Sequence, residues 1–137
     1  MKTEIAASAG DGRFQVWARA WETDDGLVLG LFGGERTHVG TVVLGVPRPS
    51  LSDPAQVSCT SSVLNLPGHQ EEALLRPLVE AAVRHLKRPV VGVAGIHVDG
   101  VTEEQIKGLC AAAEQAWNEV LAEQKKFSKE QEFGRRR

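Results

Sequence analysis

The sequence predicts an α/β (α+β) sandwich, in which about five strands form one mixed sheet and two C-terminal helices pack on it. Short apolar segments bounded by glycine, proline and aspartate fill the first half of the chain, and such segments are typical of strands. Two segments with helical hydrophobic periodicity come later, separated by one more apolar run. The predicted order is β-β-β-β-α-β-α. The 137 residues make one domain of ordinary size.

The first two predicted strands form a hairpin. Phe14–Trp21 and Leu27–Phe32 flank Asp24-Asp25-Gly26, whose glycine suits the positive φ of a tight turn. Trp17 and Trp21 are four residues apart, so they share one face of a regular strand. That arrangement is more typical of a core or a dimer interface than of a stacking platform for a planar ligand.

Three more strands follow. His38–Val46 is rich in valine, and Val57–Leu64 comes after a segment, Pro47–Pro54, that contains three prolines. Proline has no N–H for a strand ladder, so this segment is predicted to be a loop. Pro89–Val98 is apolar on both faces, which is typical of a strand in the interior of a sheet.

Two helices are predicted after the fourth strand. The first spans about Glu71 to Lys87 and contains Pro77. Because proline inside a helix costs about 3 kcal/mol, a kink or a separate first turn ending near Arg76 is expected. The second helix opens at Thr102-Glu103-Glu104-Gln105, a capping box, and its apolar residues recur at i, i+3, i+4 and i+7.

Residues 1–124 are predicted to form the single domain and residues 125–137 a basic polar C-terminal tail. The tail carries six basic and two acidic side chains, so its net charge is +4. Because the whole chain has a net charge of −2, the remaining residues carry −6. A frayed end and an arm that orders on a partner both fit this tail. A sheet with two helices leaves an edge or a face uncovered, so we expect a homodimer.

Composition restricts the partners and the compartment. An acidic body argues against general nucleic-acid binding, and the apolar runs are too short to span a membrane. The first residues do not have the pattern of a secretory signal. The two cysteines, Cys59 and Cys110, are typical of a protein in a reducing compartment. We therefore expect a cytoplasmic protein with no nucleic-acid or membrane partner.

Three histidines, His38, His69 and His97, stand beside glycines at predicted junctions between elements. Three imidazoles suggest a zinc site and a metal-dependent hydrolase. The long intervals between them contain no close ligand pair, and histidines that cap backbone groups at strand ends explain them equally well.

Gly33-Gly34 and Gly40 bracket one of these histidines. Consecutive backbone N–H groups in such a segment can cradle an anion, although a plain loop between two strands also fits. The order of glycines is not that of a dinucleotide-binding fingerprint. No nucleophile–base pair or carboxylate pair stands out, so the residues predict a pocket at loop ends but no particular reaction.

Three segments together carry a family resemblance. They are Gly33-Gly34-x-x-x-His38-x-Gly40, Leu64-Asn65-Leu66-Pro67-Gly68-His69, and Val93-Ala94-Gly95-Ile96-His97-Val98-Asp99 followed by Thr102. The chain from about Gly26 to Val120 resembles the LpdD-type prenylated-flavin chaperones, the small subunit associated with gallate decarboxylase. The A-G-I-H-V segment ahead of a capped helix is the most specific piece.

The resemblance implies a protein that is not an enzyme. It implies binding of reduced prenylated FMN, the product of a UbiX-type flavin prenyltransferase, and help in loading it into an apo UbiD-type (de)carboxylase. It also implies a dimer with a fold similar to that of proteasome-assembly chaperones. A metal-dependent hydrolase and a protein-assembly chaperone without a small-molecule ligand are the alternatives.

The resemblance also names candidate residues. Backbone N–H groups around the two glycines, a histidine, and either Arg36 or Arg48 would hold the phosphate. Imidazoles would bond the carbonyl edge of the ring. Asp99 would either contact the cofactor or fix the loop before the second helix. The arginines that end the chain depart from the more acidic ending of the family. The candidate cofactor-binding set is Gly33, Gly34, Arg36, His38, Gly40, His69, His97 and Asp99.

Overall fold

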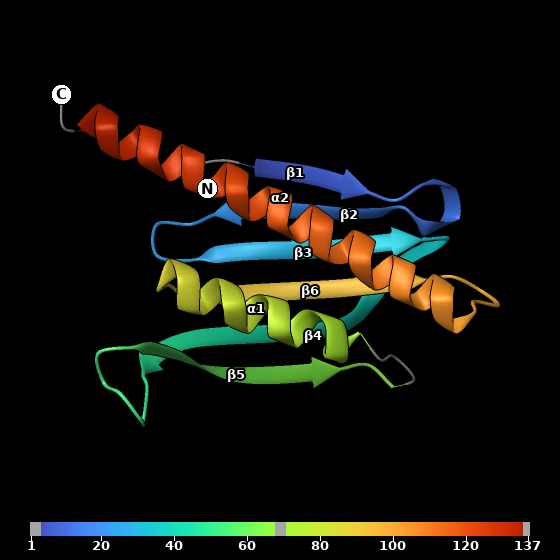
Figure 1. Ribbon diagram of the computed structural model, residues 1–137, viewed down its shortest axis with the longest axis horizontal. Coiled ribbons are helices and arrows are strands. Elements are labelled where there is room, and N and C mark those ends of the chain that lie inside the picture. The colour runs from blue at the N-terminus through green and yellow to red at the C-terminus, as the bar shows by residue number, and fades with distance from the viewer. Residues whose placement is uncertain (1–3, 68–70, 136–137) are drawn as a thin grey trace.

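Both α-helices lie on the same face of one mixed β-sheet (Figure 1). The structure is a computed structural model and describes residues 4–67 and 71–135. In these residues the sheet has six strands in the order β1-β2-β3-β6-β4-β5. Among these strands, β3 and β6 pair in parallel, and the other neighbouring pairs are antiparallel. The α+β sandwich that the sequence predicts is confirmed.

The elements follow the predicted order, with one strand added at the start. That strand, β1, consists mostly of alanine and serine, which have weak strand propensity, and it forms by pairing with β2. The elements are β1 (Glu4–Ala9), the 3-10 turn η1 (Gly12–Phe14), β2 (Val16–Glu22), β3 (Leu27–Gly34), β4 (Arg36–Pro49), β5 (Val57–Asn65), α1 (Glu72–Leu86), β6 (Val90–His97) and α2 (Glu103–Arg135).

β4 is longer than the sequence predicts, because it includes the start of the predicted loop Pro47–Pro54. Pro47 and Pro49 both lie in register with residues of β5. β4 pairs with β6 only as far as Gly45. Beyond that residue it has a single neighbour and behaves as an edge strand, where proline is tolerated.

α1 continues through Pro77, so the separate first turn predicted to end near Arg76 is wrong. Burial of the opposite helix face, with Leu75 and Val79 fully buried, holds the helix together. Proline has no N–H, so the carbonyl of Ala73 lacks the donor that residue i+4 normally supplies. Ala73 and Pro77 both lie on the exposed side of α1.

α2 begins with the predicted capping box. The Gln105 N–H donates to Thr102 Oγ1 at 3.2 Å, and the Thr102 N–H donates to Gln105 Oε1 at 3.0 Å. The helix extends to Arg135, so residues 125–135 of the predicted tail continue it. Neither α2 nor any other helix in the described residues has the length and apolar content that a membrane span requires.

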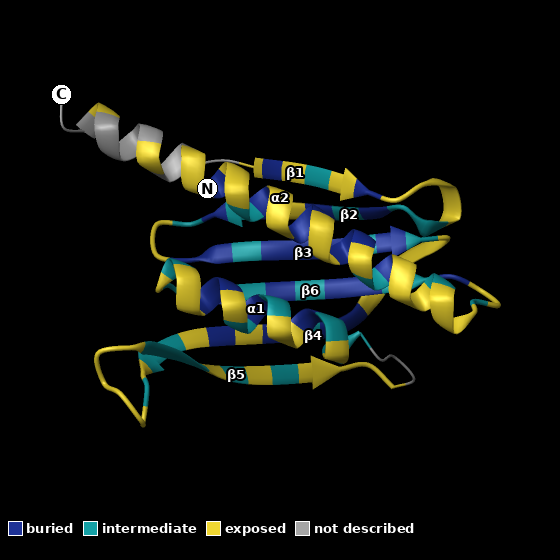
Figure 2. Cartoon of the chain, in the orientation of Figure 1, coloured by how far each residue is buried: buried dark blue, intermediate teal, exposed yellow. Residues whose placement is uncertain are grey.

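The hydrophobic core lies between the helices and the sheet, as the buried stripes in Figure 2 show. Alternate residues of β2, β3 and β6 point into it, which matches the period of two in a strand. From α2, Trp117 is the largest fully buried side chain. Further along α2, Gln124 donates to the buried carboxylate of Glu22, which also accepts from Arg88 at 3.3 Å.

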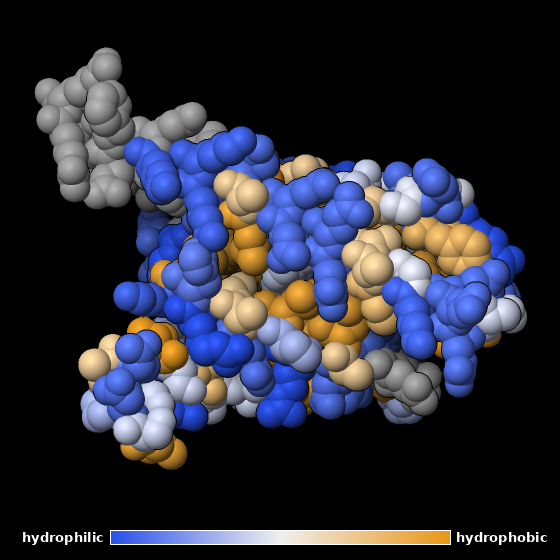
Figure 3. Space-filling view, viewed as in Figure 1, coloured by the Kyte–Doolittle hydropathy of each residue, from blue (hydrophilic) through white to orange (hydrophobic). Residues whose placement is uncertain are grey.

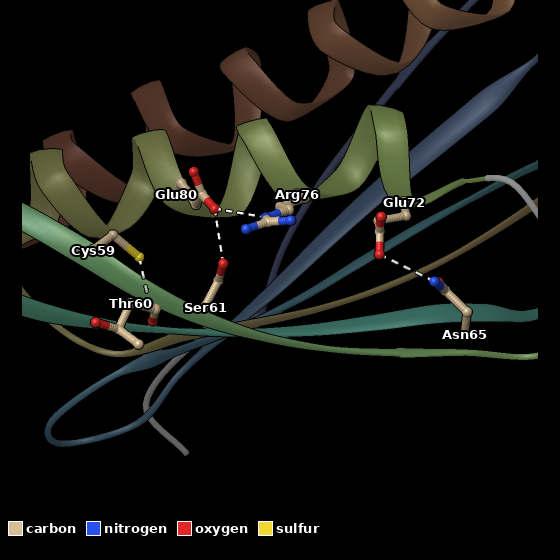
Figure 4. A network of polar contacts seen from close by, with 7 residues as sticks. All are labelled: Cys59, Thr60, Ser61, Asn65, Glu72, Arg76 and Glu80. Carbon is tan, nitrogen blue, oxygen red and sulfur yellow. Dashed lines mark hydrogen bonds and ion pairs between the residues drawn. The ribbon is translucent and has the colours of Figure 1, made fainter.

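α1 is tied to the edge strand β5 by polar contacts, drawn in Figure 4. The Ser61 hydroxyl donates to Glu80 at 2.8 Å, and Arg76 donates to the same oxygen at 2.9 Å. These two donors hold the pKa of the Glu80 carboxyl below its ordinary value. Asn65 donates to Glu72 at 3.1 Å. This network fixes the helix over β4 and β5.

The face of the sheet away from the helices carries apolar side chains that no described element covers. We call it the open face. Leu44 and Val46 of β4 and Leu64 of β5 are between 43% and 71% exposed. By register and alternation the apolar residues of the open face are Trp17, Trp21, Val28, Phe32, Val42, Leu44, Val46, Leu64, Val91 and Val93. Arg19 of β2 and Glu4 of β1 lie on the same face and form an ion pair. The prediction that the two tryptophans share a face is confirmed.

Candidate functional site

A groove with a volume of about 620 Å³ lies between α1 and α2, over the end of β6. Its walls are mainly aliphatic, with Leu74 and Leu78 from α1 and Ile106 and Leu109 from α2. Figure 3 shows apolar surface in the region between the two helices. The polar groups among the lining residues belong to Glu71, His97, Cys110 and Glu114. The volume falls in the range of about 300–1,000 Å³ found for small-molecule sites.

β6 reaches the groove between two strands that are consecutive in the chain. Gly34, at the end of β3, and Arg36, at the start of β4, both pair with His97. Glu35, between them, donates its N–H to the His97 carbonyl at 2.7 Å. The chain crosses the end of β6 at Gly34, which has φ of +77°, and a Cβ there would collide with the same carbonyl.

A bulge in β4 places His38. Thr37 pairs with Ile96 and Thr41 with Ala94, so three residues of β4 lie opposite the single residue Gly95. Any Cβ at Gly95 would collide with the carbonyl oxygen of His38. The glycine in the A-G-I-H-V segment therefore makes room for the bulge that carries the histidine.

The bulge brings His38 to Glu71, which precedes the first residue of α1. His38 Nε2 lies 2.9 Å from Glu71 Oε1, and both side chains are at least three-quarters buried. The Ile96 N–H points at the same oxygen, at 3.4 Å. Gly40 allows this approach, because a Cβ there would stand 2.6 Å from the carboxylate. Sequence reasoning missed Glu71, since a glutamate at a helix start looks like an ordinary first-turn residue.

His97 forms a second imidazole–carboxylate pair. Its Nε2 lies 2.7 Å from Asp99 Oδ1, and the hydrogen bond with the imidazole holds the pKa of Asp99 below its ordinary value. The Asp99 N–H donates to Glu35 at 3.0 Å. The rings of His38 and His97 are 6.3 Å apart, edge to face. Asp99 therefore fixes both the imidazole and the loop before α2.

Two arginines lie around the Asp99 loop. Arg13 donates to the Asp99 carbonyl at 3.2 Å. The charges of Arg36 and Arg13 both contribute to lowering the pKa of Asp99. Arg48, by contrast, bonds Thr60 and the Pro49 carbonyl. Arg13 did not stand out in the sequence, because its place beside Asp99 depends on the β1–β2 connection.

The prediction that free backbone N–H groups at Gly33-Gly34 cradle an anion is wrong. The Gly34 N–H donates to the Gln15 carbonyl at 3.0 Å, and the next N–H is bonded to His97. Gly33 packs against the Gln15 carbonyl, where a Cβ would lie 2.5 Å away. These glycines provide close backbone packing, and their N–H groups are used inside the sheet.

Most of the predicted site residues come together at one end of the sheet. Gly33, Gly34, Arg36, His38, Gly40, His97 and Asp99 all belong to the crossing, the bulge or the end of β6. His69 lies outside the described residues. Within residues 4–67 and 71–135, no three His, Cys, Asp or Glu side chains form a group that could hold a metal ion.

Comparison with known proteins gives the fold and the family. The chain is similar to a protein in the crystal structure of a chaperone complex for yeast 20S proteasome assembly, with a TM-score of 0.50 at 5% identity over 84% of this chain and 98% of that one. At that identity the likeness concerns the fold alone. No curated protein matches. Residues 10–125 match the prenylated flavin chaperone LpdD-like domain. Since this match covers most of the chain and includes the bulge, the groove and the A-G-I-H-V strand, the protein belongs to the prenylated flavin chaperone LpdD-like family.

Proposed function

We propose that this protein binds reduced prenylated FMN and assists its loading into an apo UbiD-type (de)carboxylase. It acts as a carrier of the cofactor and not as an enzyme. The observation that carries the proposal is the groove between α1 and α2, with His97 of the family's most specific segment in its lining. Membership of the family indicates that the ligand is a prenylated flavin, and the groove is an apolar space of suitable size for it.

The groove suits a carrier that must release its cargo. Aliphatic side chains on two helices would take up the ring system, and a small number of polar groups would orient it. Ile106, in the α2 wall, is 46% exposed, so the groove is open to solvent on that side. A ligand held there remains accessible to a receiving enzyme, which favours transfer over sequestration.

The open face favours a dimeric form of the protein. A second copy of this chain, seated on that face, would remove Trp17, Trp21 and the exposed aliphatic residues of β4 and β5 from water. We propose that the protein is a homodimer in the cytoplasm and that it receives its cofactor from a UbiX-type flavin prenyltransferase. The groove stays free in such a dimer, because it lies on the helical side of the sheet.

The first experiment is an anaerobic titration with reduced prenylated FMN, with reduced FMN as the ligand control. Wild type should bind the prenylated form saturably. His97→Ala should bind it about tenfold more weakly, because an oriented polar contact is lost. His85→Ala is the matched control, since His85 is exposed on α1 and does not line the groove. Absence of binding by wild type would refute the proposal.

A second experiment tests delivery. The loaded protein is mixed anaerobically with an apo UbiD-type decarboxylase, and decarboxylase activity is followed with time. Activity should appear faster than with free cofactor at the same concentration. Equal rates would refute the loading role, while leaving the binding role intact.

The open face also fits the alternative of a protein-assembly chaperone with no small-molecule ligand. That alternative predicts binding of a partner protein and no effect of groove substitutions. The same titration distinguishes the two functions, because a protein-assembly chaperone without a small-molecule ligand would not bind flavin saturably through His97.

A further inference from the structure

The charges around the groove indicate how its ligand is oriented. The side chains that line it include two carboxylates, Glu71 and Glu114, and no lysine or arginine among the described lining residues. A phosphate dianion placed there would face like charge in a partly apolar space, which is unfavourable. The groove therefore suits the largely apolar ring portion of a flavin nucleotide and disfavours its phosphate dianion.

The α2 N-terminus does not change this conclusion. Helix N-termini attract anions through free N–H groups and the helix dipole. Here the capping box uses the N–H groups of Thr102 and Gln105, and the first turn carries Glu103 and Glu104. Negative charge already occupies the position that an anionic ligand would take.

Two arginines lie just beyond the groove, at the Asp99 loop. The carboxylates of this loop already have partners, since Asp99 bonds His97 and Glu35 accepts from the Asp99 N–H. Arg13 bonds the Asp99 carbonyl, and Arg36 pairs in register with His97, a residue of the groove lining. A ligand that enters between the helices with its ring over His97 would extend its chain toward this loop. Two guanidinium groups there can form charge-assisted bonds with a phosphate.

The groove wall also offers a backbone acceptor. Pro77 cannot donate to the Ala73 carbonyl, and both residues line the groove. A carbonyl without its helical donor can accept a hydrogen bond from a ring N–H of the ligand. The reduced flavin ring presents such donors on its pyrimidine portion.

Resting on the proposed function, we infer that the groove holds the prenylated isoalloxazine ring, and that the phosphate lies outside it at Arg13 and Arg36. This assigns Arg13 to phosphate recognition and Pro77 to ring recognition. The two ends of the ligand are read by different elements, so each can be tested separately.

The test uses two ligands, reduced prenylated FMN and its dephosphorylated form, reduced prenylated riboflavin. Arg13→Gln/Arg36→Gln should weaken binding of the phosphorylated ligand about tenfold or more and leave the dephosphorylated ligand unchanged. Pro77→Ala and Ile106→Asp should weaken both ligands. Arg84 is an exposed arginine on α1 outside the groove lining, and Arg84→Gln, the control for loss of a positive charge elsewhere on the surface, should change neither affinity.

The outcomes separate the inference from the function on which it rests. If wild type binds neither prenylated ligand, the proposed function fails. If wild type binds both with equal affinity, or the arginine substitutions weaken both alike, the function stands and the assignment of the phosphate is wrong. If Ile106→Asp and Pro77→Ala leave both affinities unchanged, the ring lies outside the groove, and the inference is again overturned.

Discussion

The imidazole of His38 and the carboxylate of Glu71 lie 2.9 Å apart, although one belongs to a bulge in β4 and the other to the start of α1. Two glycines make this contact possible. Gly95 leaves space for the bulge, and Gly40 leaves space for the carboxylate. The geometry of the site therefore depends on these two glycines as much as on the polar side chains.

Gly95→Ala should destabilise the protein strongly, because the new methyl group collides with the His38 carbonyl. Overpacking of this kind costs about 1–3 kcal/mol or more. The control is Gly108→Ala on α2, where a Cβ meets nothing within 4 Å. That change should stabilise by about 0.5–1 kcal/mol through helix propensity. Urea unfolding measures both, and equal effects would contradict the bulge argument.

Pro77→Ala should raise the free energy of unfolding, since it restores the helical bond to the Ala73 carbonyl and removes a steric clash. A gain of about 1–3 kcal/mol is expected from helix propensity. Thermal unfolding in the absence of ligand is the measurement. A loss of stability would mean that the proline ring makes packing contacts that outweigh its helical cost.

Gln124→Leu should destabilise by about 1–3 kcal/mol, because it removes a donor from the buried carboxylate of Glu22. Gln115→Leu is the matched control. Its side chain is exposed and bonds Glu119 on the same helix, so a change within about 0.5 kcal/mol is expected. Hydrogen exchange along α2 should show the Gln124 effect concentrated in the second half of the helix.

The stability contribution of Glu80 should depend on pH. Its folded-state pKa lies below the ordinary 4.5 because of Ser61 and Arg76. A depressed pKa contributes stability that is present above 4.5 and is lost as the pH falls through the folded value. The difference between wild type and Glu80→Gln, about 1 kcal/mol at neutral pH, should therefore shrink below pH 4.5. Ser61→Ala should show the same trend, and a constant difference would exclude an ionised Glu80 as the cause.

Leu44→Asp should convert the proposed homodimer to a monomer, because it would bury a carboxylate within the open face. Asn118→Asp adds the same charge on the exposed side of α2 and should leave the dimer intact. Analytical ultracentrifugation at micromolar concentration distinguishes the two. A monomeric wild type would refute the use of this face by a second copy.

Local signals made most of the elements predictable from sequence. The glycine of the β2–β3 turn, the capping box of α2 and the valine-rich strands each act within a few residues. β1 carries no such signal. Its six residues include one large apolar side chain, and only pairing with β2 makes them a strand.

Several residues that the sequence singles out lie close together in the fold, but their geometry could not be predicted. His38 and His97 stood out beside glycines, and the structure brings their rings within 6.3 Å. Glu71 and Arg13 were missed, because each acquires its role from a contact made across the sheet. The idea of free N–H groups at Gly33-Gly34 failed because the insertion of β6 between β3 and β4 uses them.

That insertion also determines when the site can form. β3 and β4 leave the ribosome together, yet the strand that separates them is made only after β5 and α1. Until β6 has been synthesised, the β4 bulge cannot pack against Gly95, and no strand lies between β3 and β4. Such non-local pairing is slow to form. The unfinished chain exposes unpaired strand edges during synthesis, so the groove and the bulge beside it form only after β6 has paired with both strands.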